Sequence, residues 1–111
     1  MIGPAGPGRP AEVVELQIDE VRSASAVEAT ATVRCILGPV RRGARFTLVG
    51  DPAQAVDLQL VRIEAWGSRF VEELDPVHTA LVTLRGTGIR LLRSGAPHSG
   101  WQSIRGVNPP L

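Results

Sequence analysis

The sequence predicts an all-β domain with a barrel or sandwich architecture. Apolar and polar residues alternate with a period of two in several segments, and glycine and proline separate these segments at short intervals. No segment shows an apolar stripe of helical period. We therefore expect about six main strands between Val13 and Arg93, and no helix longer than about two turns.

Two early segments show the alternation most clearly. Apolar residues occupy every second position from Val14 to Ile18, and again from Ala29 to Leu37. Cys35 shares the apolar parity of the second segment, so its side chain should face the core, where a free cysteine behaves as a small hydrophobe. Gly38 and Pro39 end this strand.

The middle of the chain predicts a short strand followed by a long, irregular one. Arg45–Val49 forms the short strand, which stops at Gly50-Asp51-Pro52. Apolar residues then share one parity from Val56 to Leu60, after which Val61 and Ile63 take over the apolar role. A change of parity inside one strand indicates a β-bulge, here near Leu60 and Val61.

The last predicted strands follow turn signals. Gly67-Ser68 precedes a short strand that begins at Phe70, and Asp75-Pro76 ends it. The segment from Ala80 to Leu84 alternates again. Beyond Gly86 we expect the backbone from Ile89 to Arg93 to continue extended.

A length of 111 residues predicts one domain. Residues 1–12, rich in proline and glycine, are interpreted as a flexible leader, residues 13–98 as the barrel, and residues 99–111 as a C-terminal tail. The N-terminus resembles no signal peptide, and no apolar run is long enough to span a bilayer. We therefore expect a cytoplasmic protein that binds no membrane.

Charge and cysteine content exclude two broad classes of protein. All twelve basic residues are arginine, but eleven acidic residues leave a net charge of only +1, far from that of a dedicated nucleic-acid binder. A local basic patch is still compatible with this balance. The single cysteine excludes an intramolecular disulfide framework.

Three motifs, in matching order and spacing, give the chain a family resemblance from about Val14 to Pro97. The turn Gly38–Gly43 has the form Gly-x-Val-x-x-Gly, the strand Leu60–Glu64 precedes an aromatic turn, and the strand Ala80–Gly86 ends in Leu-Arg-Gly. Together they resemble domain II of the translational GTPases, such as elongation factor Tu. The resemblance implies a closed six-stranded Greek-key barrel of the translation-protein type. It also implies contact with ribosomal RNA and, in elongation factor Tu, with the aminoacylated end of tRNA.

The resemblance places three positions in one pocket. Glu64 matches an acidic residue of the family's aminoacyl-end pocket, Gly67 stands where the family has an arginine, and Thr79 stands where it has an asparagine. The family's GTPase domain is missing, because the chain has neither a Gly-x-x-x-x-Gly-Lys-[Ser/Thr] motif nor any lysine. We therefore expect no bound nucleotide.

Arginines and a tryptophan are the remaining candidate binding residues. Arg41, Arg42 and Arg45 cluster at one predicted hairpin, and Arg85 lies near another corner. They form either a solvated surface that keeps the barrel soluble or a set of phosphate contacts. Trp66 should project from a turn, either as a lid over a barrel end or as a base-stacking platform.

Catalytic and metal chemistry find little support in the sequence. His78 and His98 are both loop residues, twenty positions apart, without the compact donor spacing of a metal site. No nucleophile elbow supports a Ser-His-Asp set. We expect no enzymatic activity, no catalytic residue, no metal and no cofactor.

These observations predict a stand-alone binding module for a macromolecule. The first hypothesis is an RNA- or ribosome-facing accessory of translation. The alternative is a protein-interaction module that uses the barrel as a scaffold, for example an inhibitor, immunity protein or regulatory partner. Salt-dependent RNA affinity separates the two, because phosphate contacts release counterions.

Overall fold

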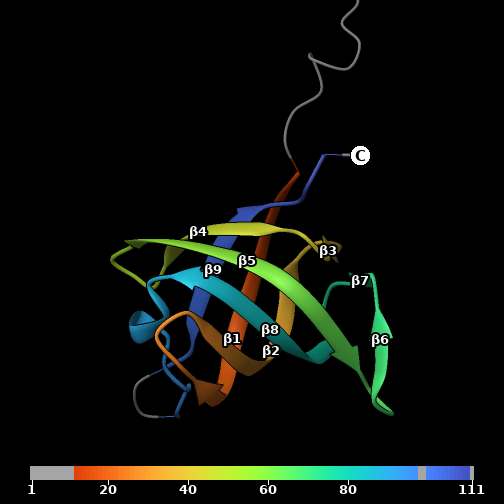
Figure 1. The fold of residues 1–111 in the computed structure, drawn as a ribbon, viewed down its shortest axis with the longest axis horizontal. Coiled ribbons are helices and arrows are strands. Elements are labelled where there is room, and N and C mark those ends of the chain that lie inside the picture. The colour runs from red at the N-terminus through yellow and green to blue at the C-terminus, as the bar shows by residue number, and fades with distance from the viewer. Residues whose placement is uncertain (1–11, 98–99, 111) are drawn as a thin grey trace, which may run out of the picture.

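The computed structural model describes residues 12–97 and 100–110, and these residues form an all-β fold (Figure 1). Strands alternate with short turns, as the Gly/Pro punctuation predicts. In chain order the elements are β1 (Val13–Ala24), β2 (Glu28–Leu37), β3 (Val40–Arg41), β4 (Arg45–Val49), β5 (Gln54–Ala65), β6 (Arg69–Val71), β7 (Glu73–Leu74), β8 (Thr79–Thr87), the 3-10 turn η2 (Ile89–Leu91) and β9 (Gln102–Val107).

Six of the strands close into an antiparallel barrel. The hydrogen-bonded order is β4-β9-β1-β2-β8-β5, and pairing of β5 with β4 closes the ring. Strand β9 lies beside β4 rather than beside its sequence neighbour β8, which gives the order β9-β4-β5-β8 of a Greek key. Strand β6 extends from the far end of β5, outside the ring, and β3 pairs with β7. The predicted closed six-stranded Greek-key barrel is confirmed.

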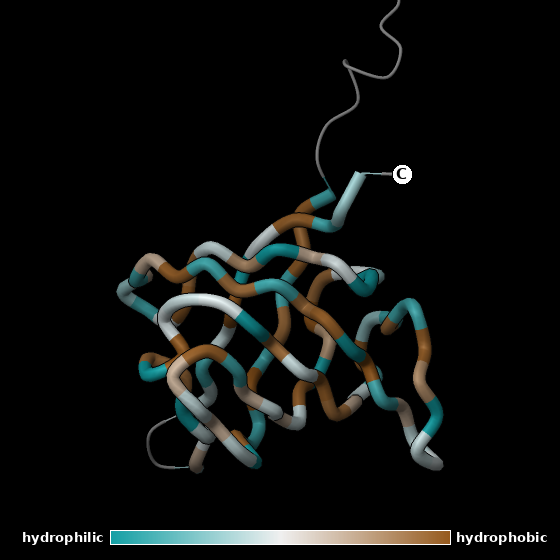
Figure 2. Tube along the Cα trace, viewed as in Figure 1, coloured by the Kyte–Doolittle hydropathy of each residue, from teal (hydrophilic) through white to brown (hydrophobic). Residues whose placement is uncertain are grey.

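The barrel interior is filled by the apolar parity of each strand. Figure 2 shows apolar and polar residues alternating along the strands. The strands that alternate in the sequence bury their apolar positions and expose the others, as the pleat requires. The largest fully buried side chains are Phe46, Leu16, Ile18, Leu58, Leu60, Ile63, Leu84, Ile104, Val14, Val33, Val40 and Val49.

Cys35 belongs to this core, as its parity predicts. Its side chain is fully buried. Burial raises the pKa of the Cys35 thiol, the charge of Asp75 raises the pKa further, and a hydrogen bond with the backbone of Val40 acts in the opposite direction. Cys35 is therefore a neutral structural thiol.

The predicted β-bulge in the long strand is present. The pairing of β5 with β8 shifts register between Leu60 and Arg62, so that Val61 has no partner on β8. Leu60 and Ile63 are both fully buried on either side of the bulge. The extra residue thus lets both halves of β5 turn their apolar side chains into the barrel.

The sixth barrel strand is not one of those expected from the sequence. The sequence predicts that residues 99–111 form a tail after the barrel, but Gln102–Val107 forms β9, which pairs with both β1 and β4. The barrel domain therefore extends past residue 98 to Val107. The short strand at Phe70, counted among the six, is β6 and lies outside the ring. The predicted leader covers residues 1–12. Of these, residues 1–11 lie outside the described residues, and only Glu12 is described.

The segment after β8 also differs from the prediction. Ile89–Leu91 forms a single 3-10 turn rather than extended backbone. The buried amide of Gln102 holds this segment, since its Nε2 donates to the Leu91 carbonyl and its Oε1 accepts from the Arg93 N–H. No helix among the described residues is both long and apolar enough to cross a membrane.

Two glycines allow the strands to approach closely where the barrel closes. A Cβ at Gly86 would collide with the backbone carbonyl of Asp57 on β5, and a Cβ at Gly106 would collide with that of Arg45 on β4. Both positions therefore require glycine for space. Gly86 is the glycine of the Leu-Arg-Gly motif.

Candidate functional site

A pocket of about 310 Å³ opens where the β5–β6 hairpin meets the start of β8. We call it the hairpin pocket. Figure 1 shows β6 standing outside the barrel beside this end of β5. Side chains and backbone from three strands and the hairpin turn line the pocket: Thr32, Glu64, Ala65, Trp66, Gly67, Ser68, Thr79, Ala80 and Leu81.

Strand register places Thr32 and Glu64 of this pocket in one row, with the apolar Leu81 between them. Thr32 on β2 is the partner of Leu81 on β8, and Leu81 is in turn the partner of Glu64 on β5. Because directly paired residues share a face of the sheet, their three side chains lie side by side on the outer surface of the barrel. Phe70 on β6 is the next partner in the row, beside Glu64.

The polar side chains of the hairpin pocket are unengaged. Within residues 12–97 and 100–110, the Glu64 carboxylate and the Thr32 and Thr79 hydroxyls make no hydrogen bond or ion pair. Among the described lining residues Glu64 is the one charged side chain. The pocket therefore offers one carboxylate and free hydrogen-bonding groups.

Trp66 projects from the hairpin turn, as the sequence predicts. The turn is closed by a hydrogen bond of 3.1 Å from the Ser68 N–H to the Ala65 carbonyl. Gly67 has a φ of 83°, a left-handed conformation that glycine adopts without strain. Trp66 is 95% exposed, so its indole covers no barrel end. The interpretation of Trp66 as a lid is therefore wrong, and an exposed aromatic surface beside Glu64 is what the turn presents.

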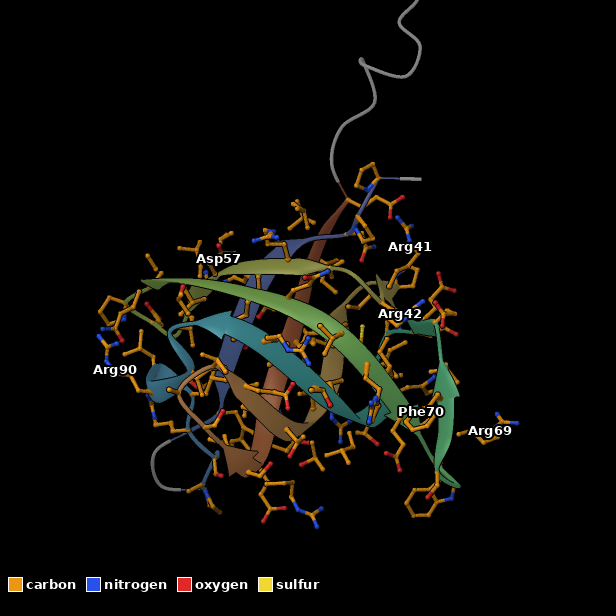
Figure 3. The ribbon with its side chains drawn as sticks, in the orientation of Figure 1. Arg41, Arg42, Asp57, Arg69, Phe70 and Arg90 are labelled. Carbon is orange, nitrogen blue, oxygen red and sulfur yellow. The ribbon has the colours of Figure 1, made fainter. Side chains whose placement is uncertain are left out.

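A cation–aromatic contact already exists on the same hairpin. The guanidinium carbon of Arg62 lies 5.1 Å from the centroid of the Phe70 ring. Phe70 is 65% exposed, and Figure 3 shows it at the junction of β5 and β6, with Arg69 extending away from the barrel. No ion pair of Arg69 is found among the described residues. Outside the pocket lining, the hairpin thus carries the exposed Phe70 ring and two arginines, Arg62 and Arg69, that form no ion pair with the described residues.

Arg41 does not have the exposed position that its turn predicts. Its side chain is only 20% exposed, and its Nη1 donates to Glu12 Oε1 at 2.8 Å. Its Nη2 donates to the carbonyl of Pro109. Arg41 therefore ties the start of β1 to the segment after β9, and it is a structural residue.

The other predicted phosphate-binding arginines are exposed but neutralised. Arg42 pairs with Glu72 at 2.9 Å, Arg45 pairs with Asp57, and Arg85 pairs with Glu28 at 2.7 Å. In Figure 3, Arg41 and Arg42 lie by β3, while Asp57 lies near the start of β5. Each guanidinium already faces a carboxylate, so the four arginines do not form a basic patch.

A second pocket, of about 400 Å³, lies at the start of β9 beside Trp101. Its two arginines, Arg93 and Arg105, are balanced by two carboxylates, Glu15 and Asp51. Arg105 Nη2 donates to the Gly50 carbonyl at 2.7 Å, while its buried Nε has no partner among the described residues. With two positive and two negative side chains, this lining favours neither an anionic nor a cationic ligand.

Metal-binding geometry is not found in the described part of the chain. No group of three or more His, Cys, Asp or Glu side chains within it could hold a metal ion. His78 is exposed in the turn before β8, and His98 lies outside the described residues.

Of the six candidate binding residues, the structure brings together only Glu64 and Trp66. The other four are arginines, and each is held in an ion pair with a carboxylate. The three positions that the resemblance assigns to one pocket, Glu64, Gly67 and Thr79, do line one pocket. Sequence reasoning missed Leu81, although an apolar residue on the polar parity of its strand was a usable signal.

Comparison with known proteins adds no assignment: no protein-family model, curated protein or solved structure matches the chain.

Proposed function

We propose that this protein is a non-enzymatic binding module that recognises a protein partner through the surface around the hairpin pocket. The observation that carries the proposal is the unengaged Glu64 carboxylate beside the fully exposed indole of Trp66. Exposed aromatic side chains beside free polar groups are typical of the central residues of protein interfaces. Fold alone does not decide function, so the proposal depends on this site.

The ion pairs of the four candidate arginines support a protein partner over RNA. RNA binding depends on cations that contact phosphates, and Arg41, Arg42, Arg45 and Arg85 each already face a carboxylate. The hairpin pocket itself carries a carboxylate, which repels phosphate.

An RNA-facing module of the translation-factor type is the second candidate, and specific observations favour it. Trp66 offers a stacking surface, and Arg69 on the neighbouring strand has no ion pair among the described residues. Together with the resemblance to domain II, these features fit a small RNA contact at the same hairpin.

Affinity capture from a lysate of the source organism, with and without ribonuclease, separates the two candidates. We expect a protein that is retained after ribonuclease treatment and lost with Trp66→Ala. Trp101→Ala is the matched control, because it removes the other tryptophan, which lies at the far pocket. Capture that disappears with ribonuclease, together with RNA affinity that falls steeply with salt, would favour the RNA-facing candidate.

A further inference from the structure

We infer that the hairpin pocket receives an arginine side chain of the partner protein. The inference rests on the proposed function and specifies the chemistry of the partner. It begins from the charge of the pocket: Glu64 is the one charged group among its described lining residues, and it forms no ion pair with the described part of the chain. Arg62, two positions earlier on β5, lies over the Phe70 ring instead. A ligand that neutralises this carboxylate must carry a positive charge.

The shape of the cation follows from the neighbours of Glu64. A carboxylate accepts two parallel hydrogen bonds from a guanidinium fork, and the planar guanidinium also stacks on an indole. Trp66, 95% exposed at the rim, is free for this stacking. A lysine ammonium offers neither the fork nor the plane, so the pairing of Glu64 with Trp66 selects arginine.

The remaining lining completes the match. The Thr32 and Thr79 hydroxyls are free to accept the guanidinium N–H groups that Glu64 leaves unbonded. Ala80 and Leu81 provide an apolar wall, against which the methylene stem of an arginine packs. The contact between Arg62 and Phe70 on the same hairpin shows a guanidinium over an aromatic ring in this protein.

A titration with small probes tests the inference without knowledge of the partner. The probe is N-acetyl-arginine methylamide, added to the full chain and followed by the NMR signals of the Trp66 indole N–H and the Glu64 amide. The matched probes are the citrulline analogue, which keeps the shape and loses the charge, and the lysine analogue. We expect saturable shifts with the arginine probe, weaker shifts with lysine and none with citrulline.

Variants identify the groups that bind the probe. We expect Glu64→Gln to weaken the arginine probe about fivefold and Trp66→Ala to weaken it about threefold, the range of exposed ion pairs and cation–π contacts. Trp101→Ala should leave its affinity unchanged. Signal dispersion in the NMR spectrum checks that each variant is folded.

Three results would overturn the inference. They are equal shifts with citrulline and arginine, unchanged arginine affinity in Glu64→Gln, and a single-stranded homopolymer RNA that moves the same signals at lower concentration than the arginine probe. Sedimentation that reveals a dimer abolished by Arg69→Ala would instead assign the pocket to a second copy of this chain. If the arginine probe fails but capture of a protein still depends on Trp66, the proposed function survives and only the arginine assignment is lost.

Discussion

The side-chain oxygen of Asn108 accepts a hydrogen bond from the backbone N–H of Arg41 at 2.8 Å, across 67 positions of sequence. Its amide nitrogen donates to the Pro39 carbonyl at 2.8 Å and to Glu12 Oε1 at 3.0 Å. The buried Asn108 amide thus joins the segment after β9, the turn before β3 and the residue before β1. Asn108 is the one asparagine of the chain, and its hydrogen bonds hold the three segments together at this end of the barrel.

Asn108→Ala should lower the free energy of unfolding by about 2 kcal/mol, because it removes three side-chain hydrogen bonds and leaves their partners unpaired. Denaturant unfolding followed by tryptophan fluorescence measures the change. Gln59→Ala, on the exposed face of β5, is the control and should stay within about 0.5 kcal/mol. A loss of unfolding free energy for Asn108→Ala no larger than that of Gln59→Ala would contradict the stabilising role of these hydrogen bonds.

Arg41→Ala should cost about 1–2 kcal/mol of stability, since Arg41 is mostly buried and bonds both Glu12 and Pro109. Arg42→Ala should change stability by less than about 0.5 kcal/mol, because its ion pair with Glu72 is exposed to solvent. The two adjacent arginines therefore form a matched pair in the same unfolding assay. An equal loss of unfolding free energy in the two variants would show that the burial of Arg41 does not stabilise the protein.

Val77→Gly should stabilise the protein by about 0.5–1 kcal/mol. Val77 has a φ of 66° in the turn closed by the hydrogen bond from His78 N–H to the Asp75 carbonyl, and a β-branched residue is strained there. Relief of about 1–2 kcal/mol of strain exceeds the entropy that glycine adds to the unfolded chain. Little packing is lost, because Val77 is 70% exposed.

Val27→Gly is the control for this substitution. Val27 is 60% exposed, and its φ is not positive. Thermal unfolding should therefore show a lower melting temperature for Val27→Gly and a higher one for Val77→Gly. A decrease in both variants would mean that the turn at Val77 stores no strain.

Cys35 should make stability depend on alkaline pH. Burial raises the pKa of its thiol in the folded state, so the unfolded chain releases the proton first as the pH rises. The stabilisation is complete below the ordinary thiol pKa of about 8.5 and is lost as the pH rises toward the folded-state pKa. Unfolding free energies measured between about pH 7.5 and 10 should fall with pH, and Cys35→Ala should flatten this part of the curve. Rapid modification of Cys35 by a thiol reagent in the native protein at about pH 8 would contradict its burial.

The sequence by itself determined the strands that have a strong period of two. Along β2 and β8 the apolar side chains occupy every second position, and the pleat turns that set inward. It also determined the bulge after Leu60, because two half-strands with different apolar parity reach the same core only through an extra residue.

Strand β9 could not be found in this way, for a physical reason. Its inward positions are Gln102, Ile104 and Gly106. Gln102 is buried because it hydrogen-bonds the η2 segment, and Gly106 is required because the backbone of β4 passes close to it. Only Ile104 is left to provide an apolar signal, and one residue has no period.

Some features of the candidate site could likewise be predicted from the sequence, and others depend on the tertiary structure. The family resemblance identified Glu64 as a pocket residue, and turn chemistry, which acts over a few residues, identified the turn that exposes the Trp66 indole. The carboxylates that neutralise the arginines come from other strands, as with Arg85 and Glu28, which are 57 positions apart. The free state of Glu64 and the pairing of the arginines were decided only by the closed barrel, because electrostatic interactions depend on distance in space rather than on separation along the chain.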